Sequence, residues 1–174
     1  MPERKTLVTS RLHLRPTRPD DARSAYEIQS NWNVCRMLAQ AAYPPDAREI
    51  AAWFRSHPDE WAEGSAFRFA VTLQGAFIGL ADFDEVSEGE ASLGYWLSES
   101  AWGHGFAREA AGAVVRFAFD DVGLSRLRAG HAEDNLASGK VLTALGFKHV
   151  SDGSLWSRSR QETVRYRRYL LVRD

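Results

Sequence analysis

The sequence of 174 residues predicts a single α/β domain in which helices flank a mixed, mostly antiparallel sheet. Two turn sequences, Gln74-Gly75 and Glu88-Gly89, separate stretches in which apolar residues alternate with polar or small ones, a pattern typical of antiparallel strands joined by tight turns. Between about residues 90 and 147 the pattern becomes strand, helix, strand, helix. The length fits one domain of roughly 100 to 200 residues, so we expect one unit over residues 1–174.

The first strand and helix are predicted from local patterns. Leu12 and Leu14 alternate with polar neighbours, which indicates a strand. The segment from Thr17 to Asp20 has the spacing of a capping box, with Pro19 inside the first helical turn. A helix is therefore expected from about Pro19 to Ser30.

A second helix and a hairpin follow. The capping spacing recurs from Asp46 to Glu49 and predicts a helix that ends near His57, because Pro58 disfavours helical geometry in the residue before it. Residues 67–71 and 77–83 then form the two strands of the hairpin around Gln74-Gly75, and residues 91–97 form the next strand.

The helix that starts near Gly103 has a face of small residues spaced three and four apart, which lets a helix lie close against a sheet. These residues are Ala107, Ala110, Ala111, Val114 and Ala118. Beyond it, Arg126 to Glu133 reads as a strand, and a helix opens at Asn135 and ends at Gly146-Phe147. Residues 148–156 and 163–172 are expected to form two final strands.

The turn from Trp102 to Ala107 predicts an anion site. It follows a strand and opens a helix, and the first N–H groups of a helix have no internal partner and carry partial positive charge. Gly103 and Gly105 would let a phosphate approach the backbone. Two alternatives compete: loop glycines without a ligand, and a Rossmann site, which fits badly because Ala107-Arg108 stands where its third glycine should be.

Three segments together resemble the acetyl-CoA-binding core of the GNAT acyltransferases. They are Leu93-Gly94-Tyr95-Trp96-Leu97, the Trp102–Ala107 turn, and Asn135-x-x-Ser138 leading to Leu145-Gly146-Phe147. The opening segment from Thr9 to Pro16, followed by Asp20-Asp21-Ala22, is similar to the start of the RimJ/RimL-like branch, which acetylates ribosomal-protein N-termini. The Gln or Arg that usually begins the family's turn is replaced here by Trp102.

The resemblance implies acetyl-CoA as co-substrate, no metal, and a set of coenzyme-binding residues. A backbone N–H near Trp96 or Leu97, where the family's strands separate, is implied as the donor to the oxyanion. The pyrophosphate is implied at the turn and Asn135 at the pantetheine arm. Arg108 and Lys140 lie near the starts of the two helices, where each either meets the coenzyme phosphates or is a solvated charge on the helix face. The full set is Trp96, Leu97, Gly103, His104, Gly105, Phe106, Ala107, Arg108, Asn135, Ser138 and Lys140.

The catalytic candidates are Ser138, Glu133 and Asp82. By resemblance, Ser138 hydrogen-bonds the coenzyme sulfur or protonates the departing thiolate. Leu142 stands where many relatives place a tyrosine for that role, so the chain has either moved the role to Ser138 or leaves it to water. The base stays open, since Ser92 replaces the carboxylate that relatives often carry. Asp82 and Asp84 share one strand face, which points either into a cleft or, as we expect, into solvent.

Other candidates for chemistry have structural explanations of comparable weight. Glu133 ends the strand before Asn135 and is the second carboxylate that could serve as the base. His131 fits such a role on pKa grounds, although a lone histidine in a strand is more often structural. The single cysteine, Cys35, excludes an intrachain disulfide and is expected to be a buried thiol.

The overall prediction is an N-acetyltransferase that works by direct attack of an amine in a ternary complex. The acceptor is a protein N-terminal amine or a small amine such as an aminoglycoside, a polyamine or an amino acid. A non-catalytic acyl-CoA-binding module is the alternative from another class. The net charge of −1 and the lack of a ~20-residue apolar run predict a cytoplasmic protein without membrane or nucleic-acid contacts, as monomer or homodimer.

Overall fold

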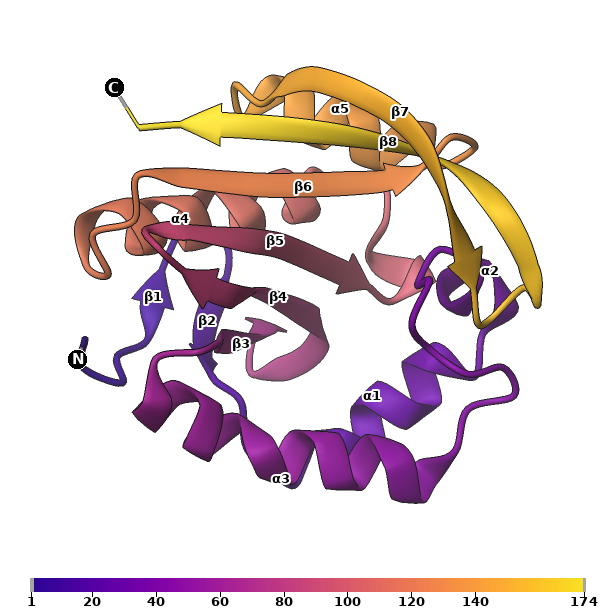
Figure 1. Cartoon of the computed structure of the whole chain (residues 1–174). Coiled ribbons are helices and arrows are strands. Elements are labelled where there is room, and N and C mark those ends of the chain that lie inside the picture. Colours follow the sequence, from indigo (N-terminus) through magenta and orange to yellow (C-terminus); the bar gives the residue numbers. More distant parts are fainter. Residues whose placement is uncertain (1, 174) are drawn as a thin grey trace.

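The computed structural model describes residues 2–173 and places all of the predicted elements (Figure 1). In chain order they are β1 (Leu7–Val8), β2 (His13–Pro16), α1 (Asp21–Gln29), α2 (Trp32–Cys35), α3 (Ala47–Glu63), β3 (Phe67–Leu73), β4 (Ala76–Ser87), β5 (Glu90–Leu97), a 3-10 turn (Glu99–Ala101), α4 (Phe106–Asp120), β6 (Arg126–Ala132), α5 (Leu136–Ala144), β7 (Lys148–Ser157) and β8 (Glu162–Val172). None of the helices within residues 2–173 has the length and apolar character needed to cross a membrane.

The strands form one eight-stranded sheet in the order β1-β2-β3-β4-β5-β6-β8-β7. Every neighbouring pair is antiparallel except β5 and β6, which run parallel. The connection between these two parallel strands is α4, as a parallel pair requires a crossover. The mixed, mostly antiparallel sheet predicted from the sequence is thereby confirmed.

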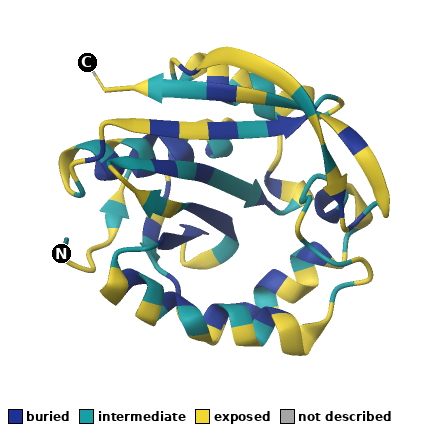
Figure 2. Cartoon of the chain, in the orientation of Figure 1, coloured by how far each residue is buried: buried dark blue, intermediate teal, exposed yellow. Residues whose placement is uncertain are grey.

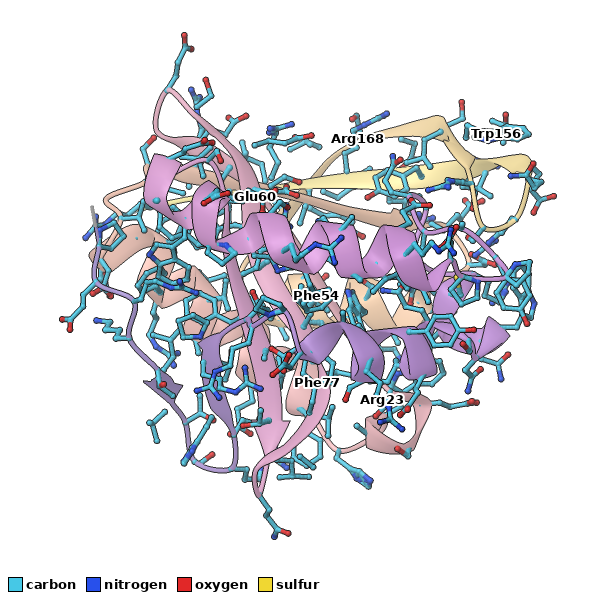
Figure 3. The ribbon with its side chains drawn as sticks, turned by 90° about the horizontal axis from the view of Figure 1, so that it is seen from below. Arg23, Phe54, Glu60, Phe77, Trp156 and Arg168 are labelled. Carbon is cyan, nitrogen blue, oxygen red and sulfur yellow. The ribbon has the colours of Figure 1, made fainter. Side chains whose placement is uncertain are left out.

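Helices cover both faces of the sheet (Figures 1 and 3). The larger core joins the small-residue face of α4 to one face of the sheet, with Phe117 among the rings of Trp61, Phe67, Phe69 and Phe83. The smaller core joins α1 and α3 to the opposite face, where Phe54 packs near Leu80. Figure 2 shows the same division along α3, whose outward residues are exposed while the sheet-facing ones are buried.

The two tight turns have the backbone that their sequences predict. Gln74 and Gly75 both have positive φ, at 51° and 84°, and Glu88 and Gly89 have 51° and 78°. Two successive residues with positive φ match the twist of the flanking strands.

The prediction that the second helix ends near His57 is wrong, since α3 continues through Pro58 to Glu63 and ends at Gly64. The start is as predicted, because the Asp46 carboxylate caps it by accepting from the N–H groups of Arg48 and Glu49. Proline costs about 3 kcal/mol inside a helix. Burial of Phe54 and Trp61, on either side of it, offsets that cost, at roughly 1.5 to 3 kcal/mol for each large apolar side chain.

The predicted capping box at Thr17 is also wrong. The Thr17 hydroxyl lies 2.8 Å from Nδ1 of His57, and α1 begins later, at Asp21, without a side-chain cap. The carboxylate of Asp21 instead accepts from the backbone N–H of Arg18. Burial lowers the pKa of His57 to about 3, so its imidazole is neutral near pH 7 and pairs with the hydroxyl. The Thr17 side chain therefore contacts His57 in the core and does not form the helix cap that the local spacing predicted.

Candidate active site

Strands β5 and β6 separate along their length, as Figure 1 shows. They are paired only from Glu90 opposite Arg126 to Ser92 opposite Arg128, although β5 continues to Leu97 and β6 to Ala132. Beyond Ser92, each strand keeps its pairing on the other side, β5 with β4 and β6 with β8. The backbone groups that face the gap thus remain available to a bound molecule.

The orientation of the N–H groups at the end of β5 favours Leu97 over Trp96 as a donor into the gap. The N–H of Ser98 donates to the carbonyl of Ile78, at 2.8 Å, on the β4 side. Because successive N–H groups of a strand point to opposite sides, the N–H of Leu97 faces β6 and that of Trp96 faces β4. The side chain of Trp96 lies on the α3 face, with its ring 6.1 Å from that of Phe77.

The turn before α4 has the properties of an anion site. From Gly103 to Arg108, no backbone N–H donates to an acceptor in the described part of the chain. Gly103 and Gly105 have φ of 78° and 79°, and Gly105 is the N-cap of α4. Six free N–H groups at a helix start, lying largely at the surface, fit the pyrophosphate of a coenzyme. The side chains of Arg108 and Arg116 line an adjoining groove of about 560 Å³ and supply positive charge.

Trp102 connects this turn to β5. Its indole N–H donates to the carbonyl of Leu97, at 3.0 Å. The Trp102 side chain therefore links the turn to the end of β5.

The start of α5 brings a tyrosine and a serine together. Asn135 caps the helix by accepting from the N–H of Ser138, at 3.3 Å. The Ser138 hydroxyl lies 2.8 Å from the hydroxyl of Tyr95 on β5. Burial raises the pKa of Tyr95 to about 12, against the opposing hydrogen bond from Ser138, so the phenol stays protonated. Leu142, where many relatives place a tyrosine, is fully buried.

Sequence reasoning missed the side chain of Tyr95. The available signal was strand alternation, which places Tyr95 on the same face as Leu93 and Leu97, toward α4 and α5. Sequence could not show that its hydroxyl meets Ser138, 43 residues further along the chain.

A cavity of about 840 Å³ extends through the gap and has walls on both faces of the sheet. Tyr95, Ser138 and Leu142 line it on the side of α5, and Trp53, Arg68 and Asp82 line it on the side of α3. Residues 37–42, which follow α2, form another part of its wall. A reactant that enters beside α5 and a reactant bound beneath α3 can therefore meet inside the sheet.

The C-terminal hairpin holds this part of the wall in place. The N–H of Arg158 donates to the carbonyl of Ala39, at 2.7 Å, and the guanidinium of Arg160 donates to the carbonyl of Arg36, also at 2.7 Å. The hydroxyl of Ser159 donates to the carbonyl of Leu38. The turn between β7 and β8 is thus bonded to the segment after α2.

The expectation that Asp82 faces solvent is wrong, because this side chain is buried and lines the cavity. Its Oδ2 is paired with the guanidinium of Arg68, which also pairs with Glu60 at 2.7 Å and with Asp84 at 3.3 Å. Its Oδ1 has no hydrogen-bond donor among the described residues and lies over Gly94, 2.7 Å from where a Cβ would stand. Burial raises the pKa of Asp82 to about 7, with Arg68 opposing the shift. A carboxylate of this kind can accept a proton near neutral pH.

The remaining candidates either lie outside the cavity or have their polar atoms already hydrogen-bonded. Glu133 does not line the cavity and pairs with Arg165 and Arg167, at 3.3 and 3.6 Å. Lys140 is exposed on α5 and does not line the cavity either. His131 does line it, but both ring nitrogens have partners, the carbonyl of Ala132 and the hydroxyl of Tyr169.

Cys35 is buried, as expected. Burial raises the pKa of its thiol to about 11, which keeps the sulfur protonated and unreactive near neutral pH.

Comparisons with known proteins agree with this geometry. A family model described as an acetyltransferase (GNAT) domain matches residues 11–148. The chain is 29% identical to the uncharacterized N-acetyltransferase p20 of Bacillus licheniformis over 148 residues, which cover 83% of each chain. Its fold is similar to that of RimL, a ribosomal L7/L12 α-N-protein acetyltransferase in complex with coenzyme A, with a TM-score of 0.87, 18% identity and coverage of 97% and 98%.

A second solved structure with this fold is Mycobacterium smegmatis RimJ in complex with a CoA disulfide. The TM-score is 0.81 at 22% identity, over 92% of this chain and 81% of that one. The match of the family model spans the turn, the gap and the tyrosine–serine pair. The chain therefore belongs to the GNAT family and is an acetyl-CoA-dependent N-acetyltransferase.

Proposed function

We propose that the acceptor of this N-acetyltransferase is the α-amine at the N-terminus of a protein or peptide, which attacks the acetyl group directly. The observation that carries the proposal is the cavity at the gap between β5 and β6, which joins the Tyr95–Ser138 pair on the α5 side to an acidic chamber on the α3 side. The carboxylates that line this chamber are Asp46, Glu49, Asp82, Asp84 and Glu85. Such a chamber favours a cationic amine over an acidic acceptor.

On the donor side, the N–H groups of the turn would hold the pyrophosphate of acetyl-CoA, with Arg108 nearby. Asn135 lines the cavity and its side-chain N–H groups face no acceptor among the described residues, so it can serve the pantetheine arm. The Leu97 N–H is the donor proposed for the oxyanion. Acetyl-CoA supplies the activated acyl group, while the chain supplies position and hydrogen bonds.

On the acceptor side, Asp82 is proposed as the base. The amine nitrogen forms a bond to the thioester carbon, its proton passes to Oδ1 of Asp82, and the bond from that carbon to sulfur breaks. A carboxylate with a pKa of about 7 is matched to an α-amine, whose pKa is near 8, better than to a lysine near 10.4. This match is what favours an N-terminal amine.

The departing thiolate takes its proton from the Tyr95–Ser138 pair. Tyr95→Phe is expected to lower kcat by about ten- to a hundredfold. This is at or below the lower end of the range for acid–base groups, since water can replace one donor of a pair. Ser138→Ala is expected to act in the same direction but less strongly, because Tyr95 keeps the carbonyl of Ser138 as a partner, at 3.2 Å. Steady-state rates at saturating acetyl-CoA measure both, and an unchanged kcat in Tyr95→Phe would contradict the assignment.

The acceptor is tested by supplying acetyl-CoA with a panel of N-terminal peptides, their N-blocked lysine counterparts, and small amines, while thiol release is followed. RimL, by its name, acts on the α-amine of L7/L12, so peptides with diverse first residues belong in the panel. We expect turnover of free N-terminal peptides. Turnover of small amines alone would overturn the proposal.

Binding of the donor is measured separately by thermal unfolding. At about 100 times its Kd, acetyl-CoA should stabilise the fold by roughly 2.7 kcal/mol. Stabilisation without turnover of any amine would indicate a coenzyme-binding module instead of the proposed acceptor chemistry.

A further inference from the structure

The N-terminal segment Thr9-Ser10-Arg11 contacts the first turn of α4, although it lies about a hundred residues earlier in the chain. The Arg11 guanidinium donates to Oε2 of Glu109 through Nε, at 2.7 Å, and through a terminal nitrogen, at 2.6 Å. Its other terminal nitrogen donates to the carbonyl of His104, at 2.8 Å. The guanidinium also lies over the ring of Phe106, 4.6 Å from the centroid. One side chain thus contacts three residues at the start of α4.

The other carboxylate oxygen of Glu109 is equally occupied. Oε1 accepts from the hydroxyls of Thr9, at 2.6 Å, and Ser10, at 3.1 Å, and from the backbone N–H of Arg11, at 2.8 Å. Burial alone would raise the pKa of Glu109, but these hydrogen bonds lower it to about 2. Glu109 therefore carries a full negative charge one helical turn from the free N–H groups of the turn.

The bond to His104 fixes the direction of a neighbouring N–H. In a trans peptide the C=O and the following N–H point in opposite directions. With the His104 carbonyl held toward Arg11, the N–H of Gly105 must point away from Arg11, where it stays free for an anion. Gly105 itself lies close to the guanidinium, since a Cβ there would stand 3.5 Å from it.

We propose that Arg11 is a positioning residue for the coenzyme: it aims the Gly105 N–H into the pyrophosphate site and neutralises the Glu109 carboxylate beside that site. The inference rests on the donor half of the proposed function and is independent of the acceptor. Arg11 has two features that separate this role from core packing. Its side chain is 47% exposed, and its planar group makes a fork, a carbonyl contact and a ring contact at once, which lysine cannot reproduce.

The test compares CoA binding by calorimetry in the wild type, Arg11→Ala and Arg11→Lys, with Arg23→Ala as a matched control. Arg23 is an exposed arginine on α1 whose ion pair is with Glu27 in its own helix (Figure 3). Loss of a charge-assisted contact corresponds to roughly ten- to a hundredfold in affinity, and we expect Arg11→Ala to raise the Kd for CoA by that amount. Arg11→Lys should recover little, and Arg23→Ala should bind as the wild type does.

A second substitution separates positioning from stability. In Arg11→Ala the unneutralised Glu109 carboxylate repels the phosphates, so adding Glu109→Gln should lower the Kd for CoA again by severalfold. If Arg11 only stabilised the fold, removing its partner as well would leave CoA binding equal or weaker. Melting of each variant without ligand shows whether the fold is retained at the assay temperature.

A shortened donor completes the test. Acetylpantetheine lacks the pyrophosphate, so its turnover with an accepted amine should be equal in the wild type and Arg11→Ala, while kcat/KM with acetyl-CoA falls. Equal losses with both donors, or wild-type affinity of Arg11→Ala for CoA, would overturn the inference. Absence of CoA binding in the wild type would instead disprove the donor site itself.

Discussion

Replacing Asp82 with asparagine is expected to lower kcat about 10²- to 10⁴-fold, the range for loss of a general base. Asparagine has the same shape and can still face Arg68, but its Oδ1 cannot take up the proton of the amine. In the wild type, kcat should rise with pH through about 7, as Asp82 loses its proton and becomes able to act as a base. Asp82→Asn should lack this rise. Rates at saturating substrates between pH 5.5 and 9 would show both effects.

Asp84→Asn is the matched control for this variant. Asp84 lies on the same strand face and pairs with the same guanidinium, but its side chain is 39% exposed. Its replacement should change kcat by much less than that of Asp82. If both variants lose the same activity, or if Asp82→Asn keeps the rise in kcat near pH 7, Asp82 is not the base.

The second large effect is on stability and concerns Arg68. This arginine is buried and pairs with Glu60, Asp82 and Asp84. Arg68→Leu leaves these carboxylates without a cation, and removing one partner of a buried pair costs about 3 to 5 kcal/mol. Without Arg68 the pKa of Asp82 rises further above its unfolded value. Below the wild-type value of about 7, Asp82 is protonated in both folded proteins, so the part of the loss due to its charge is greatest above about pH 7 and disappears as the pH falls below that value.

Denaturant unfolding of Arg68→Leu at pH 8 and pH 5 measures this loss. Adding Asp82→Asn should restore part of the free energy of unfolding, because it removes the most deeply buried of the three charges. Arg126→Leu is the control, since Arg126 pairs with Glu90 at the surface, where a pair contributes about 0 to 1 kcal/mol. A loss in Arg68→Leu no larger than in Arg126→Leu would contradict the structural role of this network.

The features predicted correctly from sequence are those specified by neighbours in the chain. Gln74-Gly75 forms a turn because its own backbone can take positive φ, and Asn135 caps α5 because its side chain reaches an N–H three residues later. The free N–H groups around Gly103 and Gly105 are also specified locally, because the first N–H groups of any helix have no partner within the helix.

The features that sequence did not reveal depend on contacts between distant residues. Thr17 had the spacing of a cap, but His57 offered its hydroxyl a partner in the core. The alternation of β4 placed Asp82 on one face of the strand without showing what covered it, and α3 together with Arg68 decided the outcome. The contact between Tyr95 and Ser138 depends on where α5 lies beside the gap.

The hydrogen bonds between the C-terminal hairpin and residues 36–39 have a consequence for engineering. The cavity wall at residues 37–42 comes from an early segment, but the hydrogen-bond donors that keep it in place lie more than a hundred residues later, in Arg158, Ser159 and Arg160. A chimaera that exchanges the early loop alone would import side chains without their support. The shape of this wall thus depends on two segments far apart in the chain, and grafting it onto a homologue requires both segments to be moved as one module.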